Sequence, residues 1–141
     1  MTWVKVCGLS TEADVAAAVA AGADAVGFVN VPASPRYLSL DRVGRLAADV
    51  PIHTILLTVD MPADEVLAAV EITGVSGVQP YGAHQSEAAA AAEEAGHFVL
   101  LPTTVDHRRD GGATPGIPLL DTPSTTQLGG TGRSFDWSLT E

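Results

Sequence analysis

The sequence predicts an α/β fold of about six parallel strands in one domain, and three observations support this prediction. The chain has 141 residues, and 46% of them are apolar, which is enough for one hydrophobic core. Short β-branched or apolar runs alternate with Ala-rich stretches of helical length. This alternation recurs along the chain, as it does when parallel strands are joined by right-handed helical crossovers.

Each predicted strand is a short apolar run bounded by turn or cap residues. The run at 3–7 is β-branched and stops at Gly8, and the run at 53–59 is almost entirely apolar, as expected when both of its faces are covered. The predicted strands are 3–7, 24–30, 53–59, 77–81, 97–101 and 117–121.

Capping residues mark the starts of the predicted helices. Thr11, with Asp14 three positions on, resembles a capping box, and Ser39 is placed to cap the second helix. Asp60 is expected to cap the third helix, with Pro62 near its first position. The predicted helices run over 11–21, over 39–49, from 60 onward, and over 86–95.

A segment rich in Gly and Pro interrupts the alternation between the fifth and sixth strands. Residues 106–116 contain two adjacent glycines followed by a proline and another glycine, which oppose helix formation. We therefore expect a loop in place of the fifth helix. Two architectures fit the whole pattern, a doubly wound sheet and part of a (β/α)8 barrel, and periodicity does not choose between them.

Charge and composition argue against several classes of function. A net charge of −10 repels phosphate backbones and disfavours nucleic-acid binding, although a cluster of backbone N–H groups can still bind a phosphorylated small molecule. Cys7 is the only cysteine, so no internal disulfide forms, and the four histidines lack metal-ligand spacing. Neither a signal peptide nor an apolar run of membrane-spanning length is present. These features predict a cytoplasmic protein with no metal and no membrane partner.

Two residues with chemically reactive side chains end predicted strands. Cys7 ends the first and Asp121 the sixth, and parallel β/α folds place their chemistry at these strand ends. Lys5 lies two positions before Cys7, so it points to the same side of the strand, where its ammonium group would stabilise the thiolate that a base requires. Alternatively, Cys7 is a small buried apolar residue, Lys5 an exposed charge and Asp121 a loop cap.

Four segments, in order and spacing, resemble the phosphoribosylanthranilate isomerases, the (β/α)8 enzymes of tryptophan biosynthesis. The segments are VKVCGL at 4–9, GADAVGFV with SPRYLS at 22–29 and 34–39, GVQPYG at 77–82, and LLDT with GGTGRSFDW at 119–122 and 129–137. The resemblance implies one incomplete (β/α)8 (TIM) barrel domain over 1–141. It covers about the first two thirds of the family's length, so the last two β/α units, which bind the substrate phosphate in the family, are expected to be absent.

The resemblance also implies a reaction. The family carries out an Amadori rearrangement of N-(5′-phosphoribosyl)anthranilate without metal or cofactor, in which an acid helps to open the ribose ring and a base removes the C2′ proton. Cys7 matches the base, Asp121 the acid, and Arg36 a residue that contacts the anthranilate carboxylate. The other candidate substrate-binding residues are Lys5, Gln79, Gly130 and Gly132.

The fourth predicted strand departs from the family, which reads Gln-Leu-His-Gly where this chain has Gln-Pro-Tyr-Gly at 79–82. Pro80 removes a backbone donor from the sheet, and Tyr81 does not carry protons near neutral pH as His does. These differences favour an alternative function, a non-catalytic or repurposed descendant that acts as a binding or assembly protein. A third hypothesis uses Cys7 and Asp121 for another acid–base reaction on a sugar.

The number of strands also predicts a partner. Six strands with the tilt of an eight-stranded barrel do not close, which leaves the first and sixth with exposed apolar edges. We therefore expect a second copy of the chain, or a separate partner chain, to cover these edges.

Overall fold

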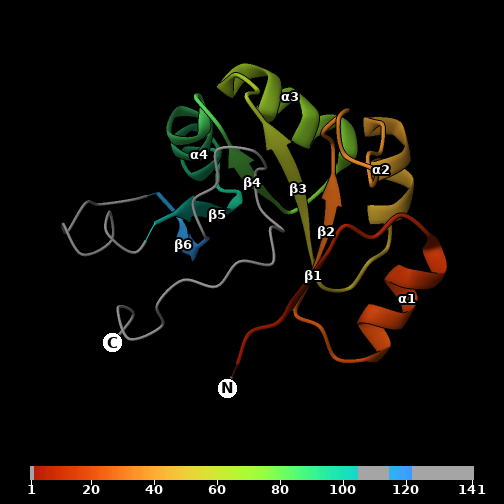
Figure 1. The fold of residues 1–141 in the computed structure, drawn as a ribbon. Coiled ribbons are helices and arrows are strands. Elements are labelled where there is room, and N and C mark those ends of the chain that lie inside the picture. Colours follow the sequence, from red (N-terminus) through yellow and green to blue (C-terminus); the bar gives the residue numbers. More distant parts are fainter. Residues whose placement is uncertain (1, 105–114, 122–141) are drawn as a thin grey trace.

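The structure is a computed structural model that describes residues 2–104 and 115–121, in which strands and helices alternate up to β5 (Figure 1). We expected a loop in place of the fifth helix at 106–116. Most of this segment, residues 106–114, lies outside the described residues. The element bounds are β1 Lys5–Cys7, α1 Glu12–Ala20, β2 Ala25–Val29, α2 Leu40–Ala47, β3 His53–Val59, α3 Ala63–Thr73, β4 Gly77–Tyr81, α4 Gln85–Glu94, β5 Phe98–Thr103 and β6 Ile117–Leu120.

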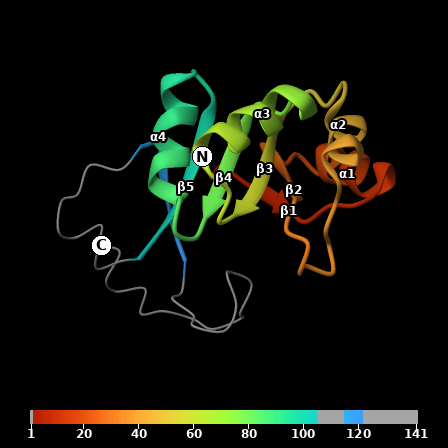
Figure 2. The ribbon, with the colours of Figure 1, turned by 90° about the horizontal axis from the view of Figure 1, so that it is seen from above.

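The six strands form one parallel sheet in the order β1-β2-β3-β4-β5-β6. A doubly wound sheet reverses its strand order at a switch point, whereas a barrel keeps the order of the chain. The helices α1 to α4 all lie on one convex face of the sheet, as Figure 2 shows. The fold is therefore a curled half-barrel of six strands, and the prediction of an incomplete (β/α)8 barrel is confirmed.

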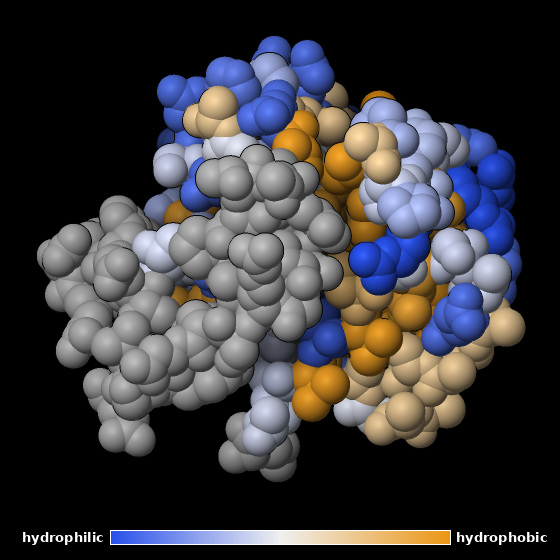
Figure 3. All heavy atoms as spheres, viewed as in Figure 1, coloured by the Kyte–Doolittle hydropathy of each residue, from blue (hydrophilic) through white to orange (hydrophobic). Residues whose placement is uncertain are grey.

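The main hydrophobic core lies between the convex face of the sheet and the helices. Strand side chains at Phe28, Leu56 and Val78 pack there against Val43 of α2 and Val66 of α3, and all five are fully buried. Burial of such side chains contributes about 1.5–3 kcal/mol each. In Figure 3, hydrophilic residues cover the outer surface of the helices at the top and right, and hydrophobic residues are visible in the strip between these surfaces.

Contacts across the concave face show how strongly the sheet curls. Trp3, just before β1, stacks on Phe98 of β5 with ring centroids 5.7 Å apart, although three strands separate β1 from β5 in the sheet. His53 of β3 stacks on the same ring at 4.6 Å. A flat sheet would hold β1 and β5 about four strand spacings apart, close to 19 Å.

Two of the three predicted N-caps are confirmed. Thr11 Oγ1 accepts the backbone N–H of Asp14 at 3.1 Å, and Ser39 Oγ accepts that of Arg42 at 3.3 Å. The prediction for Asp60 was wrong, because Pro62 occupies the N-cap position of α3. Asp60 adopts a positive φ, and its Oδ1 instead accepts the backbone N–H of Ala83, 2.7 Å away, in the loop after β4.

Pro80 lies inside β4, where the sequence suggested it would be disruptive. Pro80 pairs with Thr58 of β3, and the β3–β4 ladder continues to Tyr81, whose carbonyl accepts the N–H of Asp60. The backbone groups of Pro80 point away from β3, because neighbouring residues of a strand alternate sides. The missing donor is therefore on the β5 side, where the β4–β5 ladder has already ended at Val78.

Within the part of the chain that the structure describes, no helix is long and apolar enough to cross a membrane. In the same part, β1 and β6 each pair with one other strand. The expectation that a second chain covers these edges stays a prediction.

Candidate functional site

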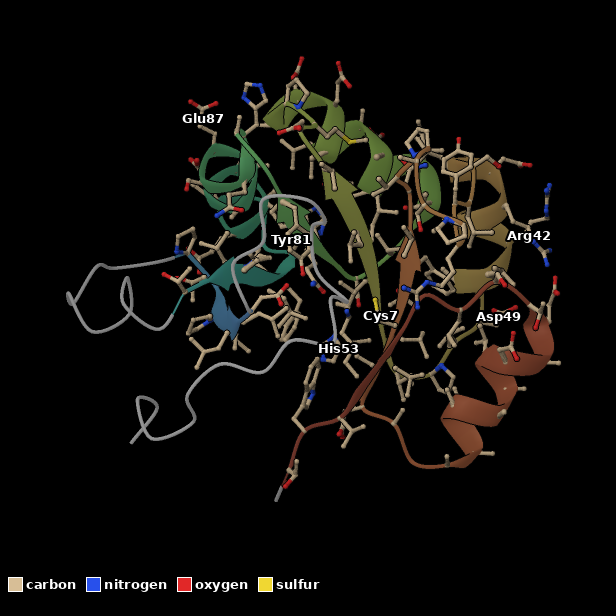
Figure 4. All side chains as sticks on the ribbon, viewed as in Figure 1. Cys7, Arg42, Asp49, His53, Tyr81 and Glu87 are labelled. Carbon is tan, nitrogen blue, oxygen red and sulfur yellow. The ribbon has the colours of Figure 1, made fainter. Side chains whose placement is uncertain are left out.

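The two predicted reactive residues lie at C-terminal strand ends. Cys7 is the last residue of β1 and is exposed, so it is not a buried apolar residue. Asp121 follows β6 directly, and its backbone N–H donates to Thr103 of β5 at 3.0 Å. Figure 4 shows Cys7 and Tyr81 on the inner side of the sheet, away from Arg42 and Asp49 near the helices.

Gly27 of β2 makes room for Lys5 and Cys7 on the concave face. Gly27 pairs with Cys7 in the sheet, and a Cβ at this position would lie 2.8 Å from Cys7 Sγ and 3.1 Å from Lys5 Nζ. Both side chains therefore lie over the same glycine, which confirms that they point to one side of β1. The ammonium group and the thiol therefore share one small region of the concave face.

A chain of hydrogen bonds crosses the concave face from β1 to the end of β6. Lys5 Nζ donates to Gln79 Oε1 at 2.6 Å. Gln79 Nε2 donates to the Tyr81 hydroxyl at 2.9 Å, and that hydroxyl donates to Asp121 Oδ2 at 3.1 Å. Lys5 and Gln79 are 74 positions apart in the chain, and the curl of the sheet brings their side chains together.

Tyr81 is the site residue that the sequence did not predict. It was considered only as a departure from the family's histidine, yet it lies two positions from Gln79 and therefore on the same face of β4. Burial raises the pKa of the Tyr81 phenol well above its usual value. The nearby Asp121 charge raises this pKa further, whereas the hydrogen bond from Gln79 lowers it. Electrostatic interaction with Cys7 makes the smallest contribution and also raises the pKa. The phenol therefore stays neutral and keeps its proton for hydrogen bonding.

Arg36 lies at the same end of the sheet, beside β1. A Cβ on Gly8, which has φ +79°, would meet Arg36 Cδ at 2.8 Å, so the arginine side chain lies directly over the residue that follows Cys7. Asn30 Nδ2 donates to the Leu38 carbonyl at 2.8 Å and ties the two ends of the Arg36 loop together. Arg36 is exposed, which leaves its planar guanidinium available for a carboxylate.

The structure thus gathers five of the seven predicted site residues at one end of the half-barrel. They come from β1, the loop after β2, β4 and the end of β6, and they are Cys7, Lys5, Arg36, Gln79 and Asp121. Gly130 and Gly132 lie outside the described residues. The roles of all seven in catalysis or binding stay predictions.

Comparison with known proteins gives one consistent result. The family model for N-(5′-phosphoribosyl)anthranilate isomerase matches residues 4–141. A relative from Symbiobacterium thermophilum, named N-(5′-phosphoribosyl)anthranilate isomerase, is 36% identical over 97% of this chain. The chain spans 63% of that relative's length.

Solved structures agree in fold. The crystal structure of phosphoribosyl anthranilate isomerase from Thermotoga maritima matches with a TM-score of 0.84 and 30% identity, over 99% of this chain and 70% of the other. A structure of a phosphoribosyl anthranilate isomerase in complex with reduced 1-(o-carboxyphenylamino)-1-deoxyribulose 5-phosphate matches with a TM-score of 0.72 and 26% identity, over 86% of this chain and 65% of the other.

Proposed function

Since the chain belongs to the family of N-(5′-phosphoribosyl)anthranilate isomerases, we propose that its half-barrel carries the acid–base part of that family's reaction. The substrate is N-(5′-phosphoribosyl)anthranilate, and the product is 1-(o-carboxyphenylamino)-1-deoxyribulose 5-phosphate. One observation carries the proposal: a hydrogen-bonded chain links Lys5, beside the Cys7 sulfur, to Asp121 across a single concave face.

The reaction needs an acid and a base on one substrate, and the chain supplies both at the same end of the sheet. Asp121 donates a proton to the ribose ring oxygen as the C1′–O bond breaks and an iminium forms. The Cys7 thiolate then removes the C2′ proton, and the electrons of that C–H bond form the C1′=C2′ double bond of an enolamine. Protonation at C1′, with loss of the proton from the C2′ hydroxyl, yields the ketone, so the sequence is an isomerisation with no net oxidation.

The other predicted residues would bind the charged and polar parts of the substrate. Arg36 can hold the anthranilate carboxylate with two parallel hydrogen bonds, and its place beside Cys7 orients the ring toward the base. Lys5 brings a positive charge next to the sulfur in a protein of net charge −10. Gly130 and Gly132 remain proposed donors to the substrate phosphate.

The alternative of a non-catalytic binding or assembly protein has less support. The relatives reported above are named as isomerases, and one was solved with a phosphorylated ligand that corresponds to the product. No observation specifically favours a reaction on a different sugar.

Turnover by the purified chain tests the proposal directly. We expect the purified chain to convert N-(5′-phosphoribosyl)anthranilate. The loss of the fluorescence of the substrate's anthranilate group measures this conversion. Cys7→Ser and Asp121→Asn should each lower kcat by roughly a hundredfold or more, because general acid–base groups contribute about 10²–10⁴.

Asp64→Asn is the matched control, because Asp64 is an exposed carboxylate in the first turn of α3, on the helical side of the sheet. It should turn over like the unmodified chain. If the folded chain converts no substrate, or if Cys7→Ser is as active as the unmodified chain, the proposed function is wrong.

A further inference from the structure

We infer that Tyr81 is a positioning residue for the proposed acid: its hydroxyl donates to Asp121 Oδ2 and thereby orients the carboxyl group toward the substrate. This inference rests on the proposed function for its consequence in turnover. The hydrogen-bond geometry behind it stands without that function.

The direction of every hydrogen bond in the chain is determined by its first member. An ammonium group only donates, so Lys5 requires that Gln79 present its carbonyl oxygen, at 2.6 Å. The amide nitrogen of Gln79 must then face the other way, where it donates to the Tyr81 oxygen at 2.9 Å. With its oxygen occupied as an acceptor, the phenol directs its own proton to Asp121 Oδ2, 3.1 Å away.

Burial makes this arrangement rigid. Gln79 is 3% exposed and Tyr81 is 9% exposed, so neither side chain can exchange its partners for water at low cost. Both belong to β4, in the middle of the six-stranded sheet, whereas Asp121 follows β6 at its edge. The central strand β4 therefore holds Asp121, at the edge of the sheet, through the side chain of Tyr81.

The inference explains why a tyrosine can stand where the family has a histidine. A neutral phenol, whose pKa is raised by burial, does not carry protons near neutral pH, but it remains a permanent hydrogen-bond donor. Its task is then to orient the carboxyl group, since a small misplacement of a reacting group can reduce a rate by about a hundredfold.

Tyr81→Phe is the direct test, because it removes the hydroxyl and keeps the ring. We expect kcat to fall by roughly ten- to a hundredfold with little change in KM, since Tyr81 holds the acid and does not bind substrate. Tyr37→Phe removes the hydroxyl of the other tyrosine, which is 44% exposed, and should leave kcat unchanged. Equal kcat values for Tyr81→Phe and the unmodified chain would overturn the inference.

A second measurement does not depend on turnover. In protein with ¹³C-labelled tyrosine, NMR at pH 7 follows the Cζ chemical shift of each neutral phenol, which depends on its hydrogen bonds, and Tyr81→Phe and Tyr37→Phe assign the two signals. Asp121→Asn should shift the Tyr81 signal and leave the Tyr37 signal unchanged, because it replaces the charged acceptor of the Tyr81 hydroxyl with a neutral amide. An unchanged Tyr81 signal would overturn the inference even in an active chain. A shifted signal in an inactive chain would support the contact and contradict only the proposed function.

Discussion

Gly27 shows how a single residue can determine the geometry of the site. It is buried in β2, directly beside Cys7 in the sheet, and any side chain there would enter the space held by Cys7 Sγ and Lys5 Nζ. The atoms that would have to move are the ends of flexible side chains. A substitution should therefore displace the site more than it destabilises the fold.

We expect Gly27→Ala to lower kcat/KM for N-(5′-phosphoribosyl)anthranilate by about tenfold or more, since it displaces the thiol and the ammonium group together. Thermal unfolding should show a folded protein. Gly44→Ala is the control, because a Cβ in the middle of α2 meets no atom closer than 3.6 Å. This control should keep full activity and gain about 0.5–1 kcal/mol of stability. Full activity of Gly27→Ala would contradict the proposed arrangement.

At the scale of elements, β3 carries a polar group that the fold leaves unsatisfied. Thr58 Oγ1 is fully buried and has no hydrogen-bond partner within residues 2–104 and 115–121. In contrast, Thr73 at the end of α3, also buried, donates to the Ala69 carbonyl at 2.7 Å. An unsatisfied buried hydroxyl costs free energy, whereas a satisfied one contributes modestly to stability.

Substitution of these two threonines by valine, which has nearly the same shape, should have opposite effects. Thr58→Val should raise the free energy of unfolding by about 1 kcal/mol, because it removes an unpaired polar group. Thr73→Val should lower it by about 1 kcal/mol, because it removes a hydrogen bond. Urea denaturation measures both, and a destabilised Thr58→Val would mean that the hydroxyl has a partner after all.

The elements also show how far local sequence predicts structure. The first helix begins after Thr11 and the second after Ser39, as predicted, because N-capping depends on the residue and its next three neighbours. Asp60 was misassigned because its partner, Ala83, is 23 positions away and reaches it only after β3 and β4 have paired. Pro80 was judged disruptive because the sequence does not reveal which neighbouring strand ends early.

The whole molecule is dominated by negative charge. The net charge of −10 creates repulsion that opposes the compact state, and the Arg42–Glu12 ion pair between α2 and α1 is one of few opposing contacts among the described residues. The pKa of Glu12 is lowered by this arginine. Salt screens this repulsion, and at physiological ionic strength exposed charges more than about 8 Å apart hardly repel one another.

We therefore expect the Tm at pH 7 to rise by a few degrees when NaCl is increased from about 0.01 to about 0.15 M, as measured by differential scanning fluorimetry. The same series near pH 4.5, the isoelectric point, is the control and should show a much smaller change. A Tm that falls with salt at pH 7 would show that attractive ion pairs outweigh the net repulsion.

The amino-acid sequence was sufficient to predict the alternation of strands and helices, the starts of the first two helices, and the presence of Cys7 and Asp121 at strand ends. All of these follow from side-chain periodicity and near neighbours. The curl of the sheet, with its helices on one face, became visible only in the folded chain, and this curl brings together Lys5, Gln79, Tyr81 and Asp121. The physical reason is that periodicity determines which side of a strand a residue faces, whereas curvature comes from packing between residues that are far apart in the chain.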